Sequence, residues 1–132
     1  MDCIFCKIIN KEIPNYTVYE DDHVLAFLDI FPHAEGHTVV IPKVHAHNLV
    51  ELSQDFIEPL FSGVKKVQEK IMAALNPEGF SVGWNHGEAG GQAVPHLHIH
   101  ILPRWNNDGG GSMHSLTKKL ENPDVKAVFA KL

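Results

Sequence analysis

The sequence has no apolar run that approaches the ~20 residues a helix needs to cross a bilayer. Its first residues, Met1 to Lys7, have neither the basic start nor the long apolar stretch of a secretory signal peptide. Internal repeats and low-complexity tracts are also missing, and no linker is long enough to separate two domains. These absences predict one soluble domain over residues 1–132, with no membrane partner and a cytoplasmic location by default.

Positive charge is also scarce. The chain carries 11 Lys and Arg against 16 Asp and Glu, a net charge of −5. A general nucleic-acid-binding surface needs a basic footprint, so we expect no nucleic-acid partner. A small anionic ligand is still compatible with this charge, because backbone amides and a few local cations can bind one phosphate.

Cysteine occurs only as Cys3 and Cys6, in a CxxC spacing. Structural disulfides are rare in cytosolic proteins. A thioredoxin-type redox motif needs a strand before it, and the chain has no room for one. This disfavours a redox pair without removing it, and the other interpretations are a metal site or a pair of buried thiols.

The apolar pattern predicts an α+β domain with a mainly antiparallel sheet of about five strands. The expected strands are 17–20, 23–28, 37–41, 80–85 and 95–102. The sheet is modest and its edges are exposed, so a homodimer that protects them is reasonable.

Helical spacing of apolar residues from Phe56 to Leu75 predicts the one long helix, with Ser53 as its N-cap. Pro59 lies too far inside such a helix, which predicts a kink or a later start. Asn122 as N-cap and Pro123 as first residue predict a short C-terminal helix.

Histidine is abundant, with ten residues, and His96, His98 and His100 alternate along one predicted strand. Side chains alternate between the two faces of a strand, so these three should point the same way. Leu97, Ile99 and Ile101 would then point to the opposite face, where they can seal the core. The preceding loop, residues 87–92, is rich in glycine and can turn backbone N–H groups toward an anion.

Such a row can perform nucleophilic chemistry on phosphorus. A neutral imidazole can attack a phosphoryl group and form a phosphoramidate-linked intermediate, while neighbouring rings and loop amides stabilise the charged oxygens. One alternative is that the histidines merely decorate a solvated strand. A zinc site made of all three is excluded, because they would span ~13 to 14 Å along a strand.

The run from His96 to Leu102 resembles the His-φ-His-φ-His-φ-φ signature (φ is apolar) of the histidine-triad family. Four further segments are similar to its Hint-like and bacterial branch: residues 3–9, 27–30, 36–43 and 90–92. The resemblance implies a nucleotide hydrolase or nucleotidyl transferase that releases a nucleoside monophosphate. The alternative is a non-catalytic purine nucleotide-binding or scaffold protein on the same fold.

The resemblance also implies a role for each matching residue. His98 matches the nucleophile, His100 contacts the phosphate and His96 orients the nucleophile. Asp29 matches the carboxylate that accepts hydrogen bonds from the ribose hydroxyls. The other implied nucleotide-binding positions are Ile4, Phe5, Ile8, Ile13, Phe27 and Ile30 around the purine, and His37, Asn85, Gly91, Gln92, Ala93 and Val94 near the phosphate.

The chain departs from the family pattern at Ala93, where phosphoramidase-type members carry a serine. The strand also ends in Leu102-Pro103-Arg104, more like the bacterial and Fhit-like members. A dinucleoside polyphosphate is therefore a credible substrate beside a nucleoside phosphoramidate.

The resemblance further implies a structural zinc held by Cys3, Cys6, His45 and His96, because some bacterial members use this set. Two cysteines and two histidines make a closed, non-catalytic site. His47 competes with His45 for the third position. No redox or organic cofactor is implied.

Overall fold

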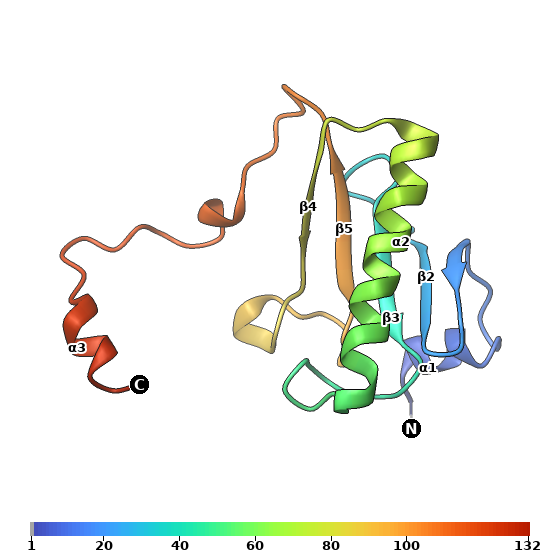
Figure 1. Ribbon diagram of the computed structural model, residues 1–132, viewed down its shortest axis with the longest axis horizontal. Helices are drawn as coiled ribbons and strands as arrows, with labels where there is room; N and C mark the ends of the chain where they lie inside the picture. Colours follow the sequence, from blue (N-terminus) through green and yellow to red (C-terminus); the bar gives the residue numbers. More distant parts are fainter. Residues whose placement is uncertain (1) are drawn as a thin grey trace.

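The computed structural model describes residues 2–132 and contains a five-stranded antiparallel sheet (Figure 1). The strand order is β1-β2-β3-β5-β4. The bounds are β1 (Thr17–Glu20), β2 (Val24–Leu28), β3 (Thr38–Pro42), β4 (Gly79–Gly83) and β5 (Ile99–Arg104). The predicted α+β architecture, with one long helix and a short C-terminal helix, is confirmed.

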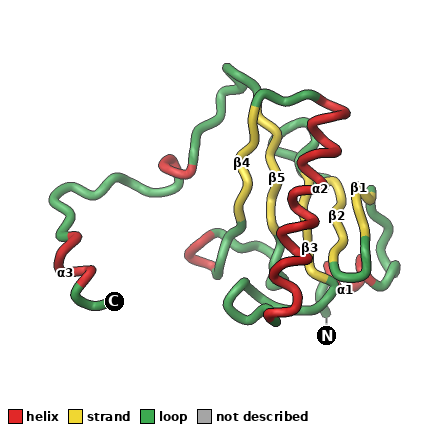
Figure 2. The backbone as a smooth tube through the Cα atoms, in the orientation of Figure 1, coloured by secondary structure: helices red, strands yellow, loops and turns green. Residues whose placement is uncertain are grey.

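One long helix, α2 (Ile57–Leu75), lies across one face of the sheet (Figure 2). It begins after a short 3-10 turn, Gln54–Phe56, which places Pro59 in the first turn of the helix, where a proline is tolerated. The predicted later start is thus confirmed. The prediction of Ser53 as the helix cap is wrong, because Ser53 precedes the 3-10 turn and makes no capping hydrogen bond with its side chain.

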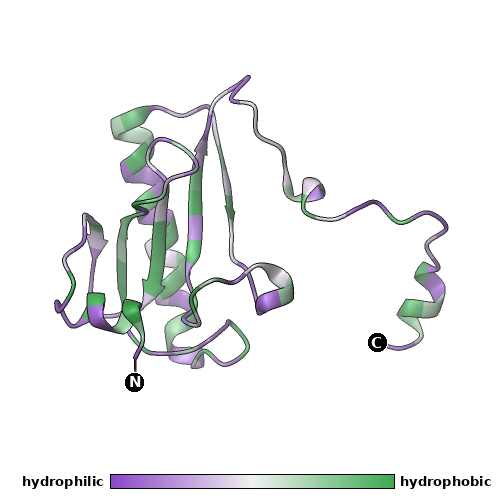
Figure 3. Ribbon diagram, turned by 180° about the vertical axis from the view of Figure 1, so that it is seen from behind, coloured by the Kyte–Doolittle hydropathy of each residue, from purple (hydrophilic) through white to green (hydrophobic). Residues whose placement is uncertain are grey.

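The sheet is apolar on both faces. Leu97, Ile99 and Ile101 pack with α2 in the larger core cluster, as their alternation predicted. The second face is covered by α1 (Ile4–Ile9). Figure 3, viewed from behind, shows apolar residues along the central strands on this side. The buried members of this smaller cluster are Ile8, Leu25, Phe27, Val39 and Ile41.

The segment before β5 is irregular, so the prediction of a strand from residue 95 is wrong. Pro95 has no N–H for a sheet ladder. The backbone N–H of His96 bonds to Val94 O at 2.8 Å, and that of Leu97 bonds to Ala46 O at 2.8 Å. These local bonds replace strand pairing until Ile99.

Other strand ends also differ from the prediction. β4 ends at Gly83 rather than at residue 85, and β3 begins at Thr38 rather than at His37. β5 continues through Pro103, which pairs with Phe80 of β4. The register with β3 ends at Ile101, so the missing N–H of Pro103 leaves no gap in that ladder.

The C-terminal segment leaves the sheet and ends in α3 (Val125–Phe129), away from the other elements (Figure 1). Asp124 is the cap, since its side chain accepts a hydrogen bond from Ala127 N at 2.9 Å. The prediction of Asn122 and Pro123 as helix start is wrong by two residues. Within residues 2–132, no helix has both the length and the apolar character for a membrane span.

Candidate active site and metal centre

The three alternating histidines lie where the irregular segment enters β5, on the side of the sheet that α1 covers. His96 and His98 are buried, and His100 is half-buried. The ring of Phe5 lies edge-on to both His96 and His98, with centroid distances of 5.9 and 5.1 Å. The rings of His98 and His100 are 5.0 Å apart. Two of the three histidines therefore share one site, while the ring of His96 turns toward a second cluster described below.

His98 has a defined tautomer. Its Nδ1 atom lies 2.7 Å from the backbone carbonyl oxygen of His96. A carbonyl oxygen can only accept, so Nδ1 must carry the proton and Nε2 must carry the lone pair. This is the tautomer that a histidine nucleophile needs, because attack uses the unprotonated nitrogen.

His100 also has a defined tautomer, set by His37. The backbone N–H of His33 donates to His37 Nδ1 at 3.1 Å, so His37 carries its proton on Nε2. His37 Nε2 then donates to His100 Nδ1 at 2.9 Å. The proton of a neutral His100 is therefore on Nε2, where it can be donated to a ligand.

Burial favours the neutral form of both His100 and His37. Burial lowers the pKa of His100 to about 4, and the neighbouring His98 and His37 add to the effect. Burial also lowers the pKa of His37, opposed in part by the Asp29 carboxylate. The pair thus offers a neutral, oriented N–H donor beside His98.

Asp29 follows β2 and lies beside the histidines. Its Oδ1 accepts a hydrogen bond from Phe31 N at 2.8 Å, and its Oδ2 lies 3.6 Å from His37 Nε2. The side chain keeps 23% of its surface exposed. A carboxylate has about four lone-pair sites, so Asp29 retains acceptor capacity for a further ligand.

The predicted purine-pocket residues divide into two groups. Ile8 and Phe27 are buried in the smaller core cluster, and Phe5 and Ile13 pack against it. The rings of Phe5 and Phe27 meet edge-on at 5.6 Å. Ile4 and Ile30 are instead exposed, at 48% and 70%. An apolar floor and two exposed apolar side chains are both available to a flat ligand.

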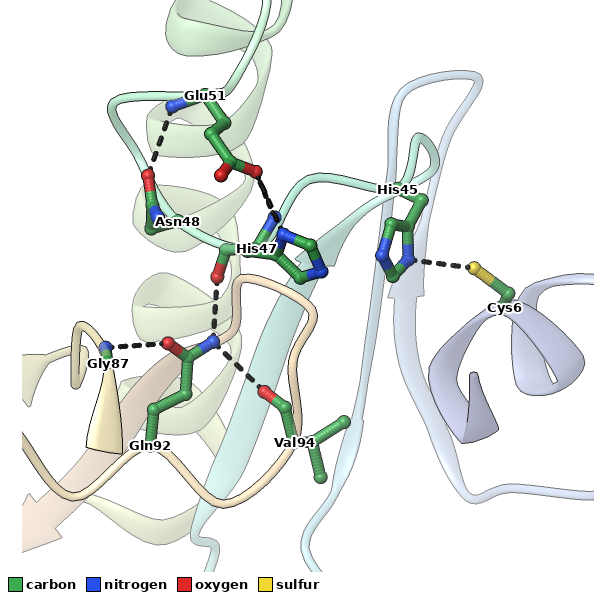
Figure 4. A network of polar contacts seen from close by, with 8 residues as sticks. All are labelled: Cys6, His45, His47, Asn48, Glu51, Gly87, Gln92 and Val94. Atoms are coloured by element: carbon green, nitrogen blue, oxygen red, sulfur yellow. Dashed lines mark hydrogen bonds and ion pairs between the residues drawn. The ribbon is translucent and has the colours of Figure 1, made fainter. Parts of the chain in front are cut away.

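The glycine-rich loop turns at Gly87 and Gly91, which have φ angles of 73° and 89° that favour glycine. Gln92 holds the loop in place (Figure 4). Its Oε1 accepts from Gly87 N at 2.9 Å, and its Nε2 donates to His47 O at 2.7 Å and to Val94 O at 3.0 Å. The Gln92 side chain therefore serves the loop itself, and a ligand would meet the backbone.

Three other predicted phosphate-site residues flank this loop. A Cβ atom placed on Gly91 would lie 3.8 Å from Asn85 Cγ, so the Asn85 side chain lies against the glycine turn. Ala93 is exposed and Val94 is half-buried. The exposed Ala93 therefore has no side-chain hydroxyl to offer a ligand at this end of the loop.

The second cluster contains Cys3, Cys6, His45 and His96, whose ligand atoms all lie within 4.8 Å of one another. His96 Nδ1 is 3.5 Å from Cys3 Sγ and 3.7 Å from Cys6 Sγ, and Cys6 Sγ is 3.4 Å from His45 Nδ1. Zinc bonds of about 2.3 Å to sulfur and about 2.05 Å to nitrogen give a tetrahedral edge of about 3.5 Å. The four residues fit a tetrahedral zinc ion.

The rival ligand His47 is engaged elsewhere. Its Nδ1 lies 3.1 Å from Glu51 Oε2, whereas His45 faces Cys6 (Figure 4). The geometry therefore favours His45 over His47. Cys3 and Cys6 share the first turn of α1, where Cys3 Sγ accepts from Cys6 N at 3.4 Å. Burial raises the pKa of the Cys6 thiol, and the neighbouring Cys3 adds to the rise.

Some partners in the site had no signal in the sequence. His96 Nε2 donates to the carbonyl oxygen of Pro42 at 3.1 Å, and His33 acts on His37 through its backbone N–H. Main-chain groups are the same for every residue type, so only the fold could reveal these contacts. The side chain of His37 was predicted near the phosphate, but its bond to His100 depends on β3 pairing with β5.

Comparisons with known proteins agree on one family. A family model described as "HIT domain" matches residues 10–107. The chain is 38% identical over 128 residues to "Adenosine 5'-monophosphoramidase hnt1" of Schizosaccharomyces pombe, covering 97% of this chain and 93% of that protein. It is 40% identical over 126 residues to "Adenylylsulfatase HINT3" of Arabidopsis thaliana, covering 96% of this chain and 64% of that protein.

A solved structure shares the same architecture. The crystal structure of a member of the HIT family from Bacillus subtilis superposes with a TM-score of 0.86 at 40% sequence identity. The match covers 99% of this chain and 94% of the other.

Proposed function

Because this chain belongs to the HIT domain family, we propose that it is a nucleotide hydrolase that acts through a nucleotidyl intermediate on His98. The observation that carries the proposal is the hydrogen bond from His98 Nδ1 to the His96 carbonyl oxygen. It leaves the lone pair on Nε2, beside a neutral N–H donor supplied by His100.

The proposed reaction has two steps. In the first, His98 Nε2 attacks the α-phosphorus, the N–P bond forms, and the leaving group departs with its bonding electrons and takes up a proton from solvent. The imidazole of the intermediate is cationic, and its Nδ1–H donates to the His96 carbonyl. In the second step, water attacks the phosphorus, the N–P bond breaks with its electron pair returning to Nε2, and the proton of the water passes to solvent, which leaves neutral His98 and a nucleoside monophosphate.

The remaining residues would bind the nucleotide. His100 Nε2–H and the loop amides at Gly91, Ala93 and Val94 would stabilise the phosphoryl oxygens. Asp29 would accept hydrogen bonds from the ribose hydroxyls. The purine would lie against the apolar set around Phe5, with Ile4, Ile8, Ile13, Phe27 and Ile30.

Two leaving groups are proposed, an amine from a nucleoside phosphoramidate and a nucleotide from a dinucleoside polyphosphate. Two relatives carry the names adenosine 5'-monophosphoramidase and adenylylsulfatase, which support an adenylyl group with a variable leaving group. Ala93 supplies no hydroxyl to the leaving group, and its identity does not distinguish between an amine and a nucleotide as leaving group.

We also propose that Cys3, Cys6, His45 and His96 hold one structural zinc ion. The ion would tie α1 to the loop after β3 and to the segment before β5, and it would add stability to the site. Metal analysis of the purified protein tests this assignment, with one zinc per chain expected.

A homodimer in the cytoplasm completes the proposal. β4 is an edge strand of the sheet. Val82 of this strand is 40% exposed and Trp84, just after it, is 37% exposed; the ring of Trp84 lies 5.9 Å from that of Phe61 of α2. An apolar edge of this kind is commonly covered by a second copy. Light scattering of the purified protein would give its mass in solution.

The experiment that tests the activity measures nucleoside monophosphate release from adenosine phosphoramidate and from diadenosine tetraphosphate. We expect release by the native protein and none by a His98→Ala variant. A His114→Ala variant is the matched control, because His114 lies exposed in the C-terminal segment. If neither substrate is cleaved while nucleotide still binds, the chain is a nucleotide-binding protein.

A further inference from the structure

We propose that the metal centre positions the catalytic nucleophile, because His96 belongs to both sites. The inference rests on the proposed function for the role of His98, and it assigns to the zinc cluster an effect on that side chain. A structural ion elsewhere in the fold would not have this effect.

Every polar group of His96 has a partner. Its Nε2 donates to Pro42 O at 3.1 Å, so the lone pair is on Nδ1, which faces Cys3 and Cys6. Its backbone oxygen accepts from His98 Nδ1 at 2.7 Å. The side chain is fully buried. The ring of His96 thus faces the metal cluster while its carbonyl holds the nucleophile.

A second connection runs through α1. Cys3 and Cys6 lie on the metal side of this helix, and Phe5 between them lies edge-on to His98 at 5.1 Å. A change in how the cysteines are held therefore moves the aromatic ring that packs against the nucleophile. Two contacts therefore confine His98, the His96 carbonyl and the Phe5 ring. Each belongs to a segment that also carries ligands of the metal cluster.

The strength of this confinement depends on the metal. Without an ion, the cluster is joined by contacts of 3.4 to 3.7 Å between sulfur and nitrogen, which are weak hydrogen bonds. With an ion, four metal bonds fix His96 and α1 together. Partners outside the first ligand shell of a metal commonly change its affinity or activity by about tenfold or more.

The test observes His98 directly by nuclear magnetic resonance on the full chain, with zinc bound and after its removal by a chelator. The Nδ1 proton of His98 should exchange with solvent about tenfold faster in the metal-free protein. This is the effect expected when one hydrogen bond that protects the proton is weakened. The Nε2 proton of His37 is the internal control, because it donates to His100 and has no contact with the cluster. Circular dichroism checks that the metal-free chain stays folded.

Kinetics give a second readout. Zinc removal should lower kcat by about tenfold, and kcat is the readout to follow, because Phe5 of α1 also belongs to the proposed purine site and its movement would change KM as well. An unchanged His98 proton signal in a folded, metal-free chain would overturn the proposal, as would a protein that binds no zinc. If the signal responds but no nucleotide is cleaved in either state, the proposed activity fails while the coupling stands.

If the metal-free chain unfolds, the coupling is measured in the opposite direction. Binding free energies between two sites are reciprocal, so loss of the His98 ring should change zinc binding. Zinc transfer to a chelator should be about fivefold faster from His98→Ala than from the native protein. His100→Ala is the matched control for this measurement. Its rate of zinc transfer should resemble that of the native protein, because His100 makes no hydrogen bond to His96 among the described contacts. Equal rates in all three proteins would overturn the proposal.

Discussion

His37 Nε2 lies 2.9 Å from His100 Nδ1, although 63 residues separate them in the sequence. β3 and β5 bring them together, since Val39 pairs with His100 in the sheet. The bond fixes which nitrogen of His100 carries the proton, and so which atom can donate to a phosphoryl oxygen.

Loss of this bond should slow catalysis. A His37→Ala variant leaves His100 free to rotate and to change tautomer, and kcat should fall by about tenfold, the worth of one hydrogen bond. His37→Gln keeps an N–H donor and should recover part of the rate. Steady-state kinetics on both variants check this, and an unchanged kcat in His37→Ala would refute the assignment.

Asp29 should contribute to nucleotide affinity more than to the chemical step. Removing a charged acceptor from two ribose hydroxyls costs about 1.5 to 3 kcal/mol, so Asp29→Ala should weaken adenosine monophosphate binding by about tenfold or more. Calorimetry measures the affinity.

The control for Asp29 uses a ligand without ribose hydroxyls. Dideoxyadenosine monophosphate should bind the native protein and the Asp29→Ala variant about equally, because neither contact can form. If the variant loses affinity for both ligands to the same extent, Asp29 does not bind the ribose hydroxyls.

The buried histidines should make the fold sensitive to acid. Burial lowers the pKa of His100 from its ordinary value of 6.5 to about 4 and lowers that of His37 as well. The unfolded chain therefore binds more protons below pH 6.5, and stability present above this pH is lost as the pH falls toward 4. The loss from His100 is about 2 kcal/mol after allowance for its partial exposure.

Denaturant unfolding at about pH 7 and about pH 4.5 measures this loss. A His100→Asn variant isolates the contribution of one ring, since all other titrating groups remain. Its stability should depend less steeply on pH than that of the native protein. Identical slopes for the two proteins would show that His100 is not held neutral by burial.

The packing of α2 on the sheet should be intolerant of one added carbon at Gly63. A Cβ atom there would lie 2.8 Å from Val24 Cγ2, closer than van der Waals contact allows. Overpacking costs about 1 to 3 kcal/mol. It opposes the roughly 1 kcal/mol that alanine gains over glycine in a helix. We expect Gly63→Ala to lower the melting temperature, while Gly79→Ala, whose Cβ would meet nothing within 4 Å, should not.

The spacing of apolar residues predicted the sheet and the long helix, because both depend on local sequence periodicity. It also predicted that Leu97, Ile99 and Ile101 face away from the histidines. It failed where tertiary bonds override the local pattern. Leu97 bonds to Ala46 rather than to a neighbouring strand, so β5 begins later than the alternation indicates. The C-terminal helix begins after Asp124 because its carboxylate reaches Ala127 N.

The site shows the same division. The alternating histidines were visible as a motif, whereas the cluster with Cys3 came only from resemblance, since 93 residues separate Cys3 from His96. The resemblance assigned His96 to both sites, but the contacts by which it joins them could not be predicted from the sequence. They depend on a main-chain carbonyl and on a ring direction that only the fold determines.

The central claim is that His98 carries the nucleotidyl group. The most direct measurement mixes the protein with adenosine phosphoramidate, quenches the reaction within one turnover, and maps added mass on the peptides. We predict one adenylyl group on the peptide that contains His98, absent from His98→Ala and retained in His114→Ala. Adenosine monophosphate release without any adduct in the native protein, or an adduct that persists in His98→Ala, would contradict the account.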